Sequence, residues 1–123
     1  MSDNPRVRDI MSSPVKTIPR EASVSEAASK MRTEEIRALL VTTSPPSIIT
    51  SADILEAVAE NKDTTELGVT QLMTDSVETV PPTLHAGEAA AMMTTFGVGH
   101  LPVLDGGDYV GIISSTDIAE QFS

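Results

Sequence analysis

The feature that most constrains this fold is an internal repeat. The segment from Val7 to Met31 recurs 62 residues later as Val69 to Met93, with its apolar, Glu, Ala and Met positions in register. After a two-residue change in spacing, residues 48–54 match residues 112–118. Repetition of this kind indicates that one structural unit is present twice. A unit of about 55 residues buries too little apolar surface to be secure alone, so we expect the two copies to share one core.

Each copy predicts the same order of elements, β-α-β-β-α. A short extended segment ends at a proline, which cannot continue a β-ladder. The helix that follows has an apolar stripe in both copies, and in the first copy Ser23 and Glu26 have the spacing of a capping box. The predicted strands are residues 15–18, 38–42 and 47–49 in the first copy, and 77–80, 101–104 and 109–113 in the second. We therefore predict an α+β fold of two such repeats packed as a pseudo-twofold pair, with repeat 1 at 1–60, a connector at 61–68 and repeat 2 at 69–123.

The second copy carries the strongest local signal. Two apolar runs flank the turn Asp105-Gly-Gly-Asp108, which predicts a β-hairpin because glycine supplies the positive φ of tight turns. The second run ends in Ser114-x-x-Asp117, and the first copy has Thr50-x-x-Asp53 at the same point. A hydroxyl and a carboxylate at this spacing start a helix. They are either ordinary caps or polar groups that bind a ligand at the mouth of an apolar cleft.

Composition excludes several classes of function. The net charge is −10 with only three lysines, which argues against general affinity for nucleic acid or an anionic membrane and is also typical of a salt-loving source. No run approaches the ~20 apolar residues of a membrane span, and a signal-peptide pattern is absent. There is no cysteine, and His85 and His100 have no clustered third ligand. We therefore expect a cytoplasmic protein without a metal site.

The ordered set of motifs resembles a tandem pair of cystathionine-β-synthase-type (CBS) domains, known as a Bateman module. The resemblance covers Val7 to Phe122, and its motifs are residues 7–11 and 69–73, the Val-x-Thr-aliphatic-Pro runs at 15–19 and 77–81, and residues 99–103 and 111–117. It implies regulatory binding of adenine nucleotides or related adenosyl ligands in two clefts between the repeats. It also implies that modules pair into a flat dimeric disc.

The residue chemistry fits an adenosine ligand. Asp53 and Asp117 are acceptors for the ribose diol, and Thr50 and Ser114 can donate to phosphate beside a helix start. The base needs an apolar slot, and the candidate slot walls are Ile18 with Pro19 and Val80 with Pro81.

The resemblance also implies that each cleft is built across the repeats. One site then combines Val15, Thr17, Arg37 and Ala38 with Ser114 and Asp117. The other combines Val77, Thr79, Gly99 and His100 with Thr50 and Asp53, and Pro102 and Thr116 complete the candidate set. We interpret the small residues Gly99 and Gly111 and the fixed turn at Pro102 as allowing close approach of the backbone to a ligand. The first repeat has other residues at these three positions, so we expect unequal clefts. Arg37 is the only cation predicted near a cleft, as a phosphate contact or a surface ion pair.

These observations predict a stand-alone regulatory module that binds AMP, ADP or ATP and signals to an effector protein. S-adenosylmethionine and NAD share the adenosine group, and no cofactor is required. The module is expected to be a homodimer. The alternative is a ligand-free scaffold or dimerisation subunit, in which the hydroxyls and carboxylates are caps only. An enzyme is disfavoured because the chain has no nucleophile–base pair and no phosphate-binding loop.

Overall fold

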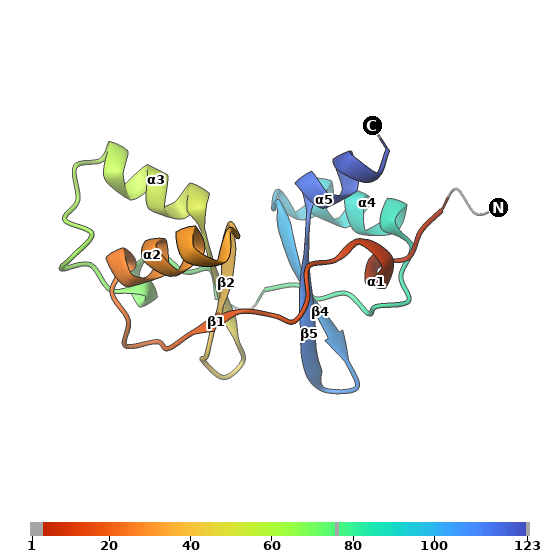
Figure 1. Cartoon of the computed structure of the whole chain (residues 1–123), viewed down its shortest axis with the longest axis horizontal. Helices are drawn as coiled ribbons and strands as arrows, with labels where there is room; N and C mark the ends of the chain where they lie inside the picture. Colours follow the sequence, from red (N-terminus) through yellow and green to blue (C-terminus); the bar gives the residue numbers. More distant parts are fainter. Residues whose placement is uncertain (1–3, 76, 123) are drawn as a thin grey trace. The chain divides into compact units, whose positions relative to one another are not determined.

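The chain divides into two compact units. The structure is a computed structural model that describes residues 4–75 and 77–122. The first-repeat unit is Lys16–Val77, and the second-repeat unit is Met1–Val15 together with Glu78–Ser123. Each unit combines helices with a small sheet, so the predicted α+β class is confirmed (Figure 1). Residues 1–3 and 123, at the ends of the predicted repeats, lie outside the described residues.

The first-repeat unit has a three-stranded sheet of order β1-β2-β3. β1 runs parallel to β2, and β2 runs antiparallel to β3. The register pairs Thr17 with Leu40 and Ala38 with Thr50. The elements are β1 (Thr17–Ile18), α2 (Val24–Glu34), β2 (Ala38–Val41), β3 (Ser47–Thr50), α3 (Ser51–Ala59) and the 3-10 helix η1 (Val69–Gln71).

The predicted capping box starts α2. The Ser23 hydroxyl accepts the Glu26 N–H at 3.0 Å, and the Glu26 carboxylate accepts the Ser23 N–H at 3.0 Å. The predicted apolar stripe faces inward, since Ala27 and Met31 join the core. That core is completed by the buried side chains of Ile18, Ala22, Leu39, Val41, Ile49 and Val69.

The second-repeat unit contains the predicted hairpin. β4 (His100–Asp105) and β5 (Asp108–Ser114) are antiparallel, and the turn between them has Gly106 and Gly107 at φ 58° and 95°. These positive values explain why glycine occupies the turn. The unit also contains α1 (Val7–Ile10), α4 (Ala86–Phe96) and α5 (Ser115–Gln121).

The strand predicted at residues 77–80 is wrong. Only Val80 pairs, through a single parallel bridge to Val103. In the first repeat, the Leu40 N–H donates to the Lys16 carbonyl at 3.0 Å and helps to extend β1 along β2. The second repeat has Pro102 at that position, and proline has no N–H to donate. The ladder is therefore reduced to the two bonds that Val80 makes with Pro102 and Leu104, at 3.0 and 2.9 Å.

The opening segment of each sequence repeat belongs to the unit formed by the other repeat. The Val7 N–H donates to the Leu84 carbonyl at 2.8 Å, and Ser12 exchanges two hydrogen bonds with Ile112. In the same way, the Val69 N–H donates to Ala22, and Thr74 exchanges two hydrogen bonds with Ile48. The compact units therefore divide the chain after residues 15 and 77, whereas the sequence repeats divide it at 61–68.

The predicted connector is hydrogen-bonded to the first helix of its unit. The Val24 N–H donates to the Leu67 carbonyl at 2.8 Å, and the Ser25 N–H donates to the Thr64 carbonyl at 2.9 Å. These bonds satisfy N–H groups in the first turn of α2 that have no partner within the helix. No helix in the described part of the chain is both long and apolar enough to cross a membrane.

Candidate ligand-binding site

The candidate hydroxyl and carboxylate of the first repeat form the cap of α3. The Asp53 N–H donates to the Thr50 hydroxyl oxygen at 3.3 Å, and the Thr50 N–H donates to Asp53 Oδ2 at 2.8 Å. The Thr50 hydroxyl also donates to Asp53 Oδ2 at 3.0 Å. The capping interpretation is therefore confirmed for this pair.

Ser114 and Asp117 cap α5 in the same way. The Asp117 N–H donates to the Ser114 hydroxyl oxygen at 3.0 Å, and the Ser114 N–H donates to Asp117 Oδ2 at 3.0 Å. Both caps use the Oδ2 atom of the carboxylate. A carboxylate has two oxygens and about four acceptor positions, so the capping role leaves acceptor capacity for a ribose hydroxyl.

The sheet places further candidate residues beside each cap. In the first-repeat unit, Ala38 is the register partner of Thr50, and the Arg37 carbonyl accepts the Ser51 N–H at 2.9 Å. The second-repeat unit repeats this geometry, with His100 opposite Ser114 and the Gly99 carbonyl accepting the Ser115 N–H at 2.9 Å. Each unit therefore has one corner where the start of a strand, a hydroxyl and a carboxylate meet. We call these the first-repeat corner and the second-repeat corner.

The candidate slot walls divide between core and surface. The side chains of Ile18 and Val80 are buried in the apolar cores of their units, where they pack against other side chains. Pro19 and Pro81 are exposed. Pro102 is fully buried in β4, and Thr116 is exposed on α5. The candidate threonines Thr17 and Thr79 and the valines Val15 and Val77 are half-buried.

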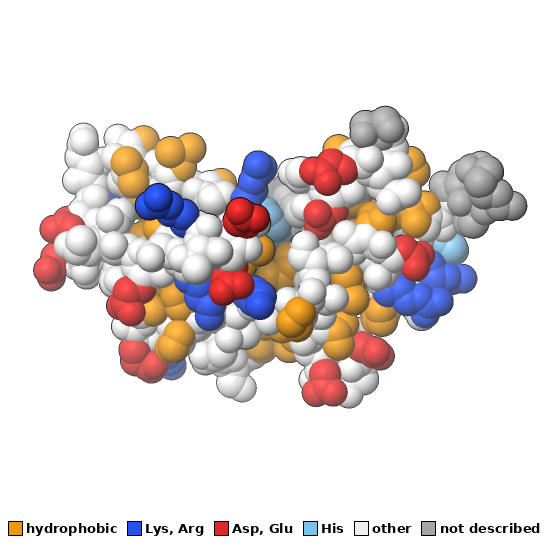
Figure 2. All heavy atoms as spheres, in the orientation of Figure 1, with side chains coloured by type: hydrophobic (Ala, Val, Ile, Leu, Met, Phe, Trp, Pro, Cys, Tyr) orange, Lys and Arg blue, Asp and Glu red, His pale blue; other side chains and the backbone are white. Residues whose placement is uncertain are grey.

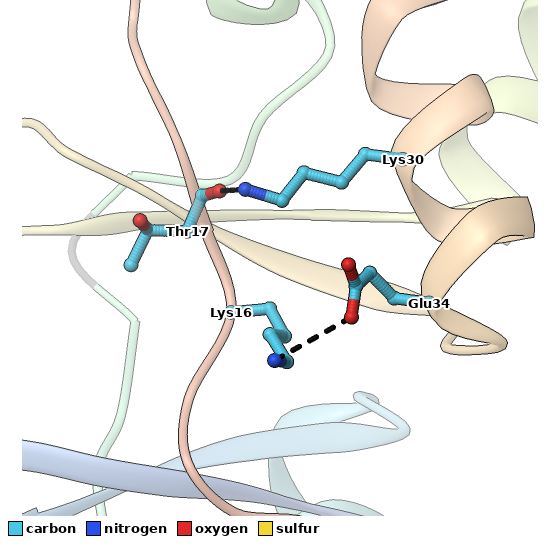
Figure 3. Close-up of polar contacts among 4 residues, drawn as sticks. All are labelled: Lys16, Thr17, Lys30 and Glu34. Carbon is cyan, nitrogen blue, oxygen red and sulfur yellow. Dashed lines mark hydrogen bonds and ion pairs between the residues drawn. The ribbon is translucent and has the colours of Figure 1, made fainter.

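A cation that the sequence analysis missed lies beside Thr17. Lys30 extends from α2 and donates to the Thr17 carbonyl at 2.5 Å, and Lys16 pairs with Glu34 at 3.4 Å (Figure 3). Arg37 is therefore not the only cation near the candidate residues. The signal was present in the sequence, because Lys30 follows the buried Ala27 by three residues and a residue at that spacing lies on the same helix face.

Other residues of the protein fill the space that a side chain at Gly111 would occupy. A Cβ at this position would lie 2.6 Å from the Ser12 carbonyl oxygen and 2.9 Å from the sulfur of Met11. The interpretation that Gly111 allows close approach to a ligand is therefore wrong. A Cβ added to Gly99 would have the Ser115 hydroxyl as its nearest neighbour, at 3.6 Å. The first repeat has Ser47 at the position of Gly111, and its buried hydroxyl donates to Asp75 at 3.0 Å.

A shallow cleft of about 200 Å³ lies next to the first-repeat corner. Of the candidate site residues, it includes Asp53. Its other lining residues come from α3 and its C-cap, the connector and the segment from η1 to Leu72, namely Glu56, Ala57, Glu60, Lys62, Gln71 and Leu72. Across residues 4–75 and 77–122, no group of three His, Cys, Asp or Glu side chains is arranged to hold a metal ion.

Two corners of equivalent geometry on two related α+β units define a tandem module of small mixed domains. A family model for the CBS domain matches residues 7–60 and again residues 69–123. The chain therefore belongs to the CBS domain family, and it contains a tandem CBS pair.

Several solved structures are similar to this chain. A CBS domain pair of protein MJ0100, in complex with 5′-methylthioadenosine and S-adenosyl-L-methionine, has a TM-score of 0.83 and 32% identity, with 97% of this chain and 96% of that one covered. The CBS domain structure NE2398 has a TM-score of 0.85 and 28% identity, covering 97% and 98%. The hexameric CBS-CP12 protein from bloom-forming cyanobacteria has a TM-score of 0.88 and 27% identity, covering 96% and 68%.

Curated relatives include longer proteins. The L-aspartate semialdehyde sulfurtransferase of Methanocaldococcus jannaschii is 34% identical over 122 residues, which is 94% of this chain and 23% of that protein. The CBS domain-containing protein YhcV of Bacillus subtilis is 27% identical over 116 residues, which is 92% of this chain and 82% of that protein. The chain therefore spans about a quarter of the sulfurtransferase.

Proposed function

We propose that this chain is a regulatory module that binds an adenosyl ligand, such as AMP, ADP or ATP, and signals its occupancy to a partner protein. The observation that carries the proposal is the pair of equivalent corners, each with a hydroxyl, a carboxylate and the start of a strand. The similarity to a CBS pair in complex with 5′-methylthioadenosine and S-adenosyl-L-methionine supports an adenosyl ligand.

Each corner offers the groups that an adenosine needs. The carboxylate of Asp53 or Asp117 accepts hydrogen bonds from the ribose hydroxyls, and the backbone at the strand start reads the edge of the base. Thr50 and Ser114 contribute hydroxyl groups for a phosphate or another 5′ substituent. The corners group these residues within one repeat, whereas the family resemblance implies sites that combine the strand start of one repeat with the hydroxyl and carboxylate of the other. That crossed partition stays a prediction.

A second candidate function is a ligand-free scaffold. It is favoured by one observation, which is that both hydroxyl–carboxylate pairs already have a complete structural role as helix caps. Self-association is part of both proposals, and exposed apolar side chains support it: Leu55 and Val58 on α3 are 70% and 53% exposed, and Phe122 is 57% exposed.

We assign no catalytic activity to this chain, since the enzyme names among its relatives belong to proteins of which it spans about a quarter.

Substitution of the carboxylates separates the two functions. Asp53→Asn and Asp117→Asn keep an oxygen that can accept the capping N–H but remove the charge. We expect each variant to weaken the binding of AMP or ATP about tenfold or more in isothermal titration calorimetry if its corner binds ribose.

The matched control is Glu26→Gln, which makes the same change in the capping box of α2, away from both corners. Binding unchanged in both Asn variants, with the wild-type chain binding normally, would show that these carboxylates are caps only. Absence of binding to the wild-type chain would support the scaffold.

A further inference from the structure

The two repeats place different charges around otherwise equivalent corners. Six of the chain's eight Lys and Arg residues lie in the first-repeat unit, between Lys16 and Lys62. Figure 2 shows Lys and Arg side chains over the α2 and β1 part of this unit, with acidic side chains among them, whereas the charged side chains at the tip of the β4–β5 hairpin are acidic. The uneven distribution gives the two units different electrostatic surroundings for a ligand.

Three cations lie on adjoining elements of the first-repeat unit. Lys16 directly precedes β1, Arg37 directly precedes β2, and Lys30 reaches β1 from α2. Because Thr17 pairs with Leu40, three residues along β2 from Arg37, the cations are spread over about 10 Å along the start of β1 and β2. We call this region the first-repeat edge and the matching residues of the other repeat the second-repeat edge. This span matches a nucleotide, whose phosphates lie several ångströms from its base.

Lys30 is the best placed of the three for a ligand. Lys16 is already paired with Glu34, whereas Lys30 donates to a neutral carbonyl. An ammonium group has three N–H donors, so the bond to Thr17 orients Lys30 and leaves donors for an anion. Within the described residues of this unit, neither Lys30 nor Arg37 is paired with a carboxylate.

The second-repeat unit lacks these cations at the corresponding positions. Glu78 stands where the first repeat has Lys16, Met92 where it has Lys30, and Gly99 where it has Arg37. Met92 packs against the apolar core of its unit, and Glu78 is exposed. His100, at the position of Ala38, brings an imidazole to this corner, but the edge as a whole carries an acid and an apolar side chain in place of two lysines.

We propose that the charge at these edges sorts adenosyl ligands by their 5′ substituent. The inference rests on the proposed function and deepens it. The first-repeat edge takes the phosphate groups of an adenosine nucleotide, with Lys30 as the specificity-determining residue. The second-repeat edge disfavours phosphate, because Glu78 repels it and Met92 cannot donate a hydrogen bond. That edge takes an adenosyl ligand with an uncharged or cationic 5′ group.

The test exchanges the residues between repeats. Lys30→Met installs the side chain of the second repeat, and Met92→Lys makes the reverse change. Arg32→Met is the matched control, since it changes net charge equally on the same helix but removes an exposed cation that does not line the cleft beside the corner. Titration calorimetry in about 0.15 M salt uses ATP and 5′-methylthioadenosine, which share the adenosine but differ in the phosphates. Circular dichroism confirms that each variant is folded.

We expect Lys30→Met to weaken ATP binding about tenfold or more, because a charge-assisted hydrogen bond is lost. Its binding of 5′-methylthioadenosine stays within about twofold of wild type, and Arg32→Met changes the binding of neither ligand. Met92→Lys adds affinity for ATP. The inference is overturned if Lys30→Met affects ATP binding no more than Arg32→Met does, or if it weakens the binding of both ligands equally. If the wild-type chain binds neither compound, the proposed function fails and this inference falls with it.

Discussion

Gly111→Ala tests the packing of the exchanged N-terminal segment in the second-repeat unit. The new Cβ would lie 2.6 Å from the Ser12 carbonyl oxygen. To reach an ordinary contact distance of 3.4 Å, that oxygen would have to retreat by roughly 0.8 Å. The same movement stretches the two hydrogen bonds between Ser12 and Ile112, now 2.9 and 3.1 Å, beyond hydrogen-bond length. Each bond contributes about 0.5–1.5 kcal/mol, so the variant should lose about 1–3 kcal/mol of unfolding free energy.

The assay is urea unfolding followed by circular dichroism, because the chain has no tryptophan to report by fluorescence. Two glycines provide matched controls. An added Cβ at Gly87 has no neighbour within 4 Å, and Gly87→Ala should stabilise α4 by up to about 1 kcal/mol. At Gly99 the nearest neighbour is 3.6 Å away, so Gly99→Ala should change stability by less than about 0.5 kcal/mol. A Gly111→Ala variant as stable as Gly99→Ala would refute the assigned contact.

Three further predictions concern hydrogen bonds. Thr50→Ala and Ser114→Ala should each cost about 1 kcal/mol in urea unfolding as lost helix caps, and a cost near zero would contradict the capping geometry. Ser47→Ala should cost about 1 kcal/mol by the same assay, because Asp75 and Thr43 lose a buried hydroxyl partner; a variant as stable as wild type would show that this network contributes nothing. The Thr65 hydroxyl and backbone N–H hold the pKa of Asp63 below its ordinary value, so the contribution of these bonds to stability is present at neutral pH and lost as pH falls through that lowered pKa. Thr65→Val should raise the pKa of Asp63 toward its ordinary value in an NMR titration of the side-chain carboxyl, and an unchanged pKa would contradict this.

The order of elements followed from the repeat and from local signals. The hairpin around Gly106 and Gly107, the capping box at Ser23 and the apolar stripe to Met31 all depend on residues close in sequence, and all three are confirmed. Local signals failed where pairing depends on a distant residue. The strand predicted at 77–80 is lost because Pro102, more than twenty residues away, has no N–H to donate.

The exchange of the opening segments is a tertiary feature without a local signal. Nothing near Ser12 or Thr74 indicates that Ser12 pairs with Ile112 and Thr74 with Ile48. The same exchange makes the role of Gly111 unpredictable from nearby residues, since the backbone that occupies its Cβ space comes from 99 residues earlier in the chain.

The candidate site was partly predictable. At each corner the hydroxyl–carboxylate pair lies beside the strand start of its own repeat, whereas the family resemblance implies that each pair joins the strand start of the other repeat. That crossed partition stays a prediction. The side chains of Ile18 and Val80, the predicted slot walls, both face the core of their units. Helix periodicity places Lys30 on the same face of α2 as Ala27, but no local pattern indicates that it contacts Thr17, which lies in a strand 13 residues earlier.

The most direct test of the account is isothermal titration calorimetry of the wild-type chain against AMP, ADP, ATP, S-adenosylmethionine, 5′-methylthioadenosine and NAD, in dilute buffer and in molar salt. The account predicts saturable heat with at least one of these adenosyl compounds, at one or two molecules per chain. A protein that is folded by circular dichroism but gives no saturable heat with any of them would contradict the account and leave the scaffold as the function of this CBS pair.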